Sequence, residues 1–324
     1  MRRNKISIKK VIQKKIEYRQ KSVVSGRKVV EKTKTVEETP KKINKTPTKD
    51  VDMNDMNERI KRRLGVQTEP INVDLVDTQL KISNNISELI VIENRVPISI
   101  IVTAYQTQDY IEECLDSIEK QTYFDGFNNY EVLVGVDGCE KTLNKLLKIR
   151  HKYRNLHIFM MESNMGTFIT SNTLLELINY ENVLRFDSDD IMLPHMINNI
   201  FYNLDNFDVI RFKFNNLVNN SLLKSNMYAF GCIFFKKHIY IKHGGYQPWK
   251  CAADGDFLNR ISENKILLIN KILFNRRIHK NNLTKRIDTG MKSQLRMKYR
   301  KLTLINKNNN INNIKTITNN YVKY

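Results

Sequence analysis

The sequence predicts an α/β fold in which a mostly parallel sheet is flanked by helices. From residue 97 onward, short apolar runs rich in β-branched residues alternate with stretches of helical periodicity. Such alternation is typical of βαβ units, whose parallel strands are covered by helices on both faces. The hydrophobic share of 41% permits a sizeable core, whereas the lysine-rich start of the chain contains too few apolar side chains to join it.

Composition divides the chain into four regions. Residues 1–63 contain 21 of the 54 Lys and Arg residues but only 8 Asp and Glu, so +13 of the net charge of +20 lies there. We therefore predict a basic, mostly disordered arm over residues 1–65 and a transition segment over 66–96. The folded domain is predicted over 97–285, followed by a polar C-terminal extension over 286–324.

The arm admits two interpretations. Ile8, Val11, Ile12 and Ile16 recur at helical spacing among lysines, as in a basic amphipathic helix that lies on a surface. A solvated charged tail explains the same residues and is the preferred interpretation.

Cysteine usage and hydropathy indicate a compartment. Cys114, Cys139, Cys232 and Cys251 are widely spaced and form no Cys-x-x-Cys pair, which favours reduced, buried thiols over a disulfide framework or a zinc site. The N-terminus lacks the apolar stretch of a signal peptide, and no window holds the roughly 18–20 apolar residues of a membrane span. We expect a cytoplasmic protein without a transmembrane segment, either soluble or peripheral at a membrane surface.

Strands and helices can be assigned in order along the domain. Strands are predicted at residues 98–104, 130–136, 156–161 and 183–186, and then from apolar runs at 209–214, 228–235 and 266–274. Helices are predicted from an N-cap at Asp109 to Gln121, over 142–153, over 167–178, and from 252 through 261. The stretch after Gly290 is polar and only weakly helical.

Polar residues follow successive predicted strands at their carboxyl ends. They are Tyr105, Asp137, Asn164 and the acidic segment 187–190. Ligands of open α/β sheets bind beyond the carboxyl ends of the strands, so we expect these side chains to converge.

The segment Asp187-Ser188-Asp189-Asp190 ends an apolar run and carries three carboxylates in four residues. Asp187 and Asp189 repel each other unless a cation lies between them, and hard divalent ions prefer oxygen ligands. The alternative is an acidic turn that caps the next helix, with Asp190 near its N-terminus and Pro194 in its first turn.

Seven segments of the domain occur in an order that is typical of one enzyme family. They are residues 99–105 with 110–118 and 121–123, Val136-Asp137-Gly138, Asn164-Met165-Gly166, Asp187-Ser188-Asp189-Asp190, Gly244-Gly245-Tyr246, Ala253-Asp254-Gly255-Asp256, and Arg277-Ile278-His279 with Asn282 and Thr284. This order resembles the family 2 glycosyltransferases, inverting enzymes that use nucleotide sugars and have the Rossmann-like GT-A fold. Val136, Gln106 and Ser171 depart from the family pattern, in which Asp, Asn and Arg are usual at these places, so we expect an unusual donor pocket.

The resemblance implies a donor site and a metal site. The implied donor-binding residues are Ala104, Tyr105, Asp137, Asn164, Gly166, Asp187 and Arg277. The implied metal ligands for Mn²⁺ or Mg²⁺ are Asp187, Asp189 and His279, although His279 could instead touch the pyrophosphate. Asp137 could accept a hydrogen bond from N3–H of uracil or could be a turn aspartate before Gly138. Asp190 could orient the metal ligands or cap a helix.

The resemblance also implies an acceptor side. Asp254 is the predicted catalytic base, because it heads a helix where partial positive charge keeps a carboxylate ionised. A plain N-cap is the alternative, and Asp256 could exchange roles with Asp254. The implied acceptor-side residues are Gly245, Tyr246, Trp249 and Asp256. Tyr246 and Trp249 could form an apolar platform for a sugar or belong to the core of a loop.

The predicted function is inverting transfer of a sugar from a nucleotide diphosphate, most simply UDP, to a hydroxyl of a polymeric glycan, lipid-linked or protein acceptor. The basic arm would attract phosphates of an anionic surface or a nucleic acid. Two alternatives remain: sugar transfer to a modified nucleic-acid base, and a catalytically inactive fold used as a binding module. Retention of the acidic segment, Asp254 and the Arg-x-His motif argues against the second.

Overall fold

The computed structural model describes residues 95–204, 206–308 and 316–324. The predicted arm, with the helical spacing at residues 8–16, and the transition segment up to residue 94 lie outside the described residues.

Within the described residues, ten strands form one sheet in the order β10-β3-β2-β1-β4-β8-β6-β9-β5, with β7 paired to β6. The four strands β3, β2, β1 and β4 are mutually parallel, which confirms the predicted fold class. The outer pairings of β4 with β8, β8 with β6, and β9 with β5 are antiparallel. The strands are β1 Ile98–Ala104, β2 Tyr130–Val136, β3 Leu156–Met161, β4 Asn182–Asp187, β5 Ile191–Met192, β6 Val209–Val218, β7 Ser221–Tyr228, β8 Ile233–Lys236, β9 Ile266–Arg277 and β10 Tyr321–Lys323.

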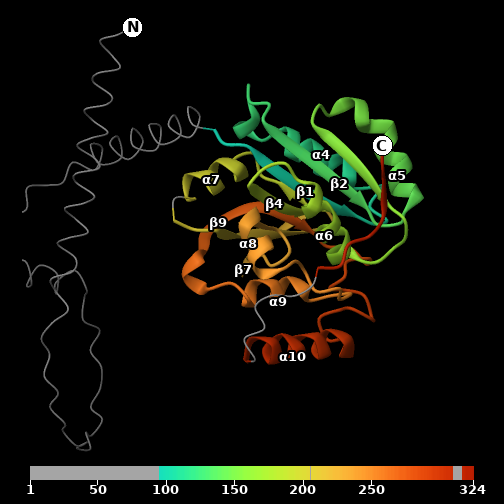
Figure 1. The fold of residues 1–324 in the computed structure, drawn as a ribbon. Helices are drawn as coiled ribbons and strands as arrows, with labels where there is room; N and C mark the ends of the chain where they lie inside the picture. Colours follow the sequence, from blue (N-terminus) through green and yellow to red (C-terminus); the bar gives the residue numbers. More distant parts are fainter. Residues whose placement is uncertain (1–94, 205, 309–315) are drawn as a thin grey trace, which may run out of the picture. The chain divides into compact units, whose positions relative to one another are not determined.

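Helices cover both faces of this sheet (Figure 1). They are α4 Ile111–Glu119, α5 Glu140–Ile149, α6 Thr167–Leu177, α7 Met196–Tyr202, α8 Lys237–His243, α9 Ala253–Asn259 and α10 Gln294–Asn308, with short 3-10 turns at Thr122–Phe124, Arg150–Lys152 and Glu263–Lys265. One hydrophobic core joins the sheet to α4, α5 and α7, and another joins it to α6, α8 and α9. Alternation along β1 explains this, because Ile100 and Val102 point into the first core and Ile101 into the second.

Four local predictions are wrong. Helix α4 follows an N-cap at Tyr110 without a side-chain capping bond, so Asp109 does not cap it. Residues 150–152 form a 3-10 turn rather than the end of α5. The run 228–235 is interrupted, because β7 ends at Tyr228 and β8 begins at Ile233. No helix begins at Asp190: β5 follows it, and α7 has its N-cap at His195.

Strand β10 was not predicted, and α10 is a longer helix than the weakly helical stretch expected after Gly290. The polar C-terminal extension contains the 15-residue helix α10, and its last strand, β10, pairs antiparallel with β3.

All four cysteines are free and buried, as expected for reduced thiols. No helix among the described residues has the length and apolar character needed to cross a membrane.

Candidate active site

The carboxyl ends of β1, β2 and β4 bring the predicted site residues to one edge of the sheet. Ala104 lies opposite Val136, and Thr103 lies opposite Asp187, in the parallel registers of β1 with β2 and with β4. The residues that follow these positions therefore emerge side by side, as expected for the ligand-binding edge of a parallel sheet. Tyr105, directly after β1, is 40% exposed at this edge.

Asp187, the last residue of β4, is paired with an arginine that the sequence analysis missed. A guanidinium nitrogen of Arg185 lies 3.1 Å from Asp187 Oδ1. Arg185 is buried and also donates to the carbonyl of Gly231 at 2.6 Å. Burial alone would lower the pKa of Arg185, but several neighbouring groups, Asp187 foremost, together outweigh burial and raise that pKa. Arg185 and Asp187 are two residues apart on one strand, so their side chains lie on the same face of the sheet. This spacing could have indicated the pair from the sequence.

Arg185 also ties β4 to α6. It donates from Nε to Ser171 Oγ at 3.1 Å and from Nη2 to Thr167 Oγ1 at 2.9 Å. Thr167 Oγ1 is in turn 2.7 Å from Thr103 Oγ1 at the end of β1. Ser171 is thus small enough to accept the guanidinium of Arg185, at a place where the resemblance led us to expect an arginine.

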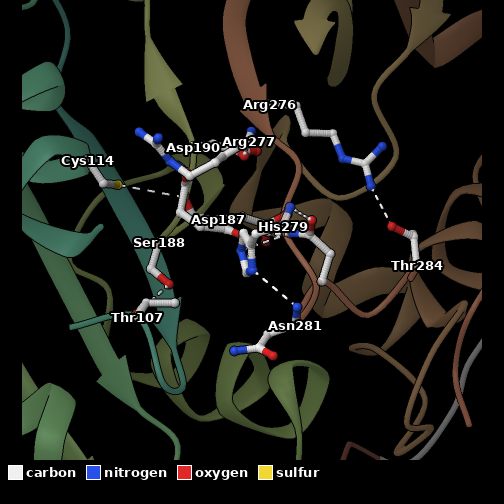
Figure 2. A network of polar contacts seen from close by, with 12 residues as sticks. Thr107, Cys114, Asp187, Ser188, Asp190, Arg276, Arg277, His279, Asn281 and Thr284 are labelled. Carbon is white, nitrogen blue, oxygen red and sulfur yellow. Dashed lines mark hydrogen bonds and ion pairs between the residues drawn. The ribbon is translucent and has the colours of Figure 1, made fainter. Parts of the chain in front are cut away.

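Asp189 is held by the segment that follows β9. His279 Nε2 lies 2.8 Å from Asp189 Oδ2, and Asn282 donates to the same oxygen at 2.9 Å. The side chains of Asp189 and His279 are 17% and 15% exposed, so both remain accessible. Figure 2 shows Arg276 extended toward Thr284, to whose hydroxyl it donates at 2.7 Å.

Asp190 and Arg277 fix the backbone around this pair. The Asp190 carboxylate is buried and accepts the backbone N–H of Arg277 at 2.9 Å. Burial and the charges of Asp189 and Asp187 raise the pKa of Asp190 well above its ordinary value. The guanidinium of Arg277 donates to the carbonyl of Asp189 at 3.1 Å and pairs with Glu113. Asp190 therefore orients the loop. Arg277, which was predicted to bind the donor, contacts Asp189, Asp190 and Glu113 in the structure.

Two sets of donor atoms could hold a cation. Asp187, Asp190 and Cys232 have ligand atoms within 4.8 Å of one another. Burial raises the pKa of Cys232 well above its ordinary value, and a protonated thiol is a poor ligand for a hard ion. The other set is Asp189 with His279. Neighbouring ligand atoms around octahedral Mg²⁺, each roughly 2.1 Å from the ion, lie about 3 Å apart, so this pair fits such a cation.

The predicted metal ligands are thus brought together only in part. Asp189 and His279 are in contact, whereas the Asp187 carboxylate is paired with Arg185. Within the described part of the chain, Asp187 shares a three-residue group with Asp190 and Cys232 rather than with Asp189 and His279.

Asp137 holds a turn. Its two carboxylate oxygens accept the backbone N–H groups of Met165 and Gly166 at 3.0 and 2.9 Å. Burial raises the pKa of Asp137, and these two hydrogen bonds oppose that effect. Gly166 has φ of +98°, and Asn164 is exposed beside it. Asp137 therefore acts as a turn aspartate for the Asn164–Gly166 segment, and its 3% exposure leaves little surface for a nucleobase.

Asp254 and Asp256 have different surroundings in α9. Asp254 is partly exposed in the first turn and accepts only the backbone N–H of Gly255, at 2.9 Å, among the described residues. Tyr246 links α9 to the end of β4, because its ring packs on Phe257 of α9 and lies 5.8 Å from the guanidinium carbon of Arg185. Asp256 is 1% exposed and pairs with Arg260 at 3.1 Å. Asp256, predicted to lie on the acceptor side and to be able to exchange roles with Asp254, is thus buried in a contact that holds α9 in place, and its role in the reaction stays a prediction.

The remaining acceptor-side residues lie in or near the core. Tyr246 is 1% exposed and packs against Phe168 and Phe257, so its ring offers no open platform. A Cβ on Gly245 would lie 2.4 Å from Asn172 Oδ1, so this glycine permits close packing rather than sugar contact. Trp249 is partly buried and stacks on Tyr299 of α10 at 4.7 Å. Of the two alternatives for Tyr246 and Trp249, these contacts favour packing within the loop and against α10, and a role in acceptor binding stays a prediction.

Comparisons with known proteins agree with this architecture. The sequence model of the family described as Glycosyl transferase family 2 matches residues 99–249. An uncharacterized glycosyltransferase of Haemophilus influenzae is 34% identical over 119 residues, which are 36% of each chain. The O-antigen biosynthesis glycosyltransferase WbnJ of Escherichia coli is 25% identical over 207 residues, 56% of this chain and 80% of WbnJ. The match thus spans about a third of the first relative and most of the second.

Solved structures share the fold. Residues 1–349 of S. aureus TarS in complex with UDP-GlcNAc superpose with a TM-score of 0.51 at 22% identity, over 58% of this chain and 60% of that one. The mannosyltransferase PcManGT of Pyrobaculum calidifontis, in complex with GDP-Man and Mn²⁺, gives a TM-score of 0.51 at 16% identity, over 60% and 62%. Residues 99–249 thus match the sequence model of the family 2 glycosyltransferases, and the sheet that they contribute to has the fold of these solved enzymes.

Proposed function

We propose that the chain transfers a sugar from a nucleotide diphosphate, first of all UDP, to an acceptor hydroxyl with inversion at the anomeric carbon. The observation that supports this most directly is the arrangement of two acidic motifs. Asp189 contacts His279 beyond β4, and Asp254 lies in the first turn of α9, the helix whose Phe257 packs on Tyr246 beneath the guanidinium of Arg185. One motif suits a metal-bound diphosphate, and the other suits a proton acceptor.

Asp189 and His279 would hold Mn²⁺ or Mg²⁺. Such an ion, when bound, neutralises charge on the leaving diphosphate. Asn282 keeps Asp189 oriented, and Asp190 and Arg277 hold the backbone on which Asp189 lies. Asp187, positioned by Arg185, would face the donor ribose or sugar.

Asp254 would act as the base. One carboxylate oxygen accepts the N–H of Gly255, and the other has no hydrogen bond among the described residues. Its place in the first turn of α9 favours the ionised form. As the acceptor oxygen bonds to the anomeric carbon and the bond to the diphosphate breaks, Asp254 would take the hydroxyl proton. The acceptor would be a glycan, lipid-linked or protein hydroxyl, and the similarity to the O-antigen enzyme favours a glycan.

The metal is tested by titrating UDP into the protein in a calorimeter, with Mn²⁺ and with a chelator. We expect at least about tenfold weaker UDP binding in the chelator and the same loss in Asp189→Ala, because the carboxylates then repel the diphosphate. Asp125→Ala, an exposed carboxylate before β2, serves as the control and should bind normally. Equal affinity with and without Mn²⁺ would remove the metal from the mechanism, and no UDP-sugar turnover with Mn²⁺ would favour the inactive fold.

A further inference from the structure

The C-terminal part of the chain is basic without acidic compensation. Residues 289–324 contain eight Lys and Arg residues and no Asp or Glu. Most of these cations belong to α10, which lies beside α9 at the margin of the fold in Figure 1. These cations are distinct in sequence from those of the predicted basic arm over residues 1–65.

One face of α10 is anchored to the domain. Tyr299 stacks on Trp249 with the ring planes 3° apart, and Asn306 donates to Asp256 at 3.1 Å. Arg296 is buried and donates to the carbonyl of Thr289 at 2.7 Å. Because these contacts recur along the helix, α10 cannot rotate about its axis, and its opposite face is fixed toward solvent.

The outward face mixes apolar and cationic side chains. Met297, Leu304 and Ile305 are 46%, 59% and 51% exposed. Four exposed cations share that face: Lys298, Arg300, Lys301 and Lys307. At about 100° per residue these seven side chains occupy roughly half of the helix circumference.

We propose that this outward face of α10 binds the surface of an anionic lipid bilayer. Lys and Arg interleaved with apolar side chains on one helix face suit the boundary between headgroups and acyl chains. A nucleic acid would use the cations but would leave Met297, Leu304 and Ile305 in water. Because α10 packs on α9, binding would hold the helix that carries Asp254 near the membrane. That last consequence rests on the proposed function, whereas the binding itself does not.

The test is sedimentation of the full chain with vesicles of phosphatidylcholine alone or mixed with phosphatidylglycerol, across a salt series and without any sugar donor. One variant is Leu304→Ser with Ile305→Ser, and another is Lys298→Gln with Arg300→Gln and Lys301→Gln. A matched control on α5 is Leu147→Ser with Lys141→Gln and Lys148→Gln, all exposed positions. The arm is unchanged in every variant.

We expect binding to anionic vesicles to fall about tenfold or more in the charge variant and to be normal in the α5 control. At roughly 1 M salt, where exposed charges are screened, remaining binding should depend on Leu304 and Ile305. Trp249, the single tryptophan, stacks on α10, so its fluorescence should change on vesicle addition in the wild type and the control only.

Two results would overturn the proposal. Equal vesicle binding by the wild type and both α10 variants would assign any binding to the arm. Retention on DNA that is as strong as on vesicles and insensitive to the serine substitutions would assign the face to nucleic acid. Since no donor is present, either result leaves the proposed transfer reaction untouched.

Discussion

The acidic segment after β4 and the first turn of α9 share one arrangement. In each, one carboxylate is buried in contacts with the protein and a neighbouring carboxylate is accessible. After β4, Asp190 is buried against the backbone of Arg277, while Asp189 stays accessible beside His279. In α9, Asp256 is buried against Arg260, while Asp254 stays partly exposed. Each region thus uses one carboxylate to fix the backbone that presents another. We therefore expect substitutions of the accessible carboxylates to change the reaction and substitutions of the buried carboxylates to change the stability of the fold.

The largest expected effect is that of Asp254→Asn. Transfer should fall about 10²–10⁴-fold, because the acceptor hydroxyl loses its base, while UDP affinity and the melting temperature stay close to the wild type. Steady-state transfer assays with a UDP-sugar, together with calorimetry, measure both. A variant that transfers at the native rate would show that the base lies elsewhere.

Asp256→Asn should give the opposite result. Its loss leaves the buried Arg260 without a charge partner, which we expect to cost about 3 kcal/mol of unfolding free energy. Urea denaturation measures this, and Asp288→Asn, which breaks an exposed pair with Arg286, should change stability little. A stable Asp256→Asn protein that has lost transfer would reverse the assignments of Asp254 and Asp256.

Arg185→Gln should affect both fold and donor. It removes donors to Gly231, Ser171 and Thr167 and should destabilise the protein by about 1–3 kcal/mol. It also frees Asp187, so KM for the donor should rise more than kcat falls. Arg211→Gln provides the control, since Arg211 also donates to a loop carbonyl, that of Ala229, but does not contact Asp187. An unchanged donor KM in Arg185→Gln would limit Arg185 to a structural role.

The smallest effect is expected for Tyr246→Phe. The buried Tyr246 hydroxyl has no hydrogen-bond partner among the described residues, so its removal should leave stability unchanged or raise it by about 1 kcal/mol. Tyr240→Phe is the matched control, because the Tyr240 hydroxyl donates to Glu176 at 2.8 Å and its loss should destabilise. Thermal melting of both variants decides the point, and a lower melting temperature for Tyr246→Phe would reveal a hidden partner.

The central sheet was predictable because its strands are buried on both faces. Strands β1, β2 and β3 begin and end where the apolar runs do, at Ile98–Ala104, Tyr130–Val136 and Leu156–Met161. The run 228–235 was wrongly predicted as one strand, because hydropathy does not show the contacts that interrupt it. The carbonyls of Ala229 and Gly231 accept from Arg211 and Arg185, so this loop is held by side chains from other strands.

The site was predictable to the level of motifs but not of individual contacts. The resemblance of their segments to family motifs pointed to Asp189, His279 and Asp254. The burial of Asp256 depends on Arg260, four residues later at the C-cap of α9, a spacing that could have been recognised. The burial of Tyr246 depends on Phe168, which is distant in sequence, and no local pattern indicates it.

The C-terminal strand β10 has a consequence for folding. It pairs with β3. Asn320 and Glu162, which flank these two strands and are 158 positions apart in the sequence, are hydrogen-bonded to each other. Contacts of such high sequence separation require the rest of the chain to be positioned before they form, so β10 should dock late. Until then, β3 presents an open row of backbone N–H and carbonyl groups, and this edge is where association of partly folded chains would begin.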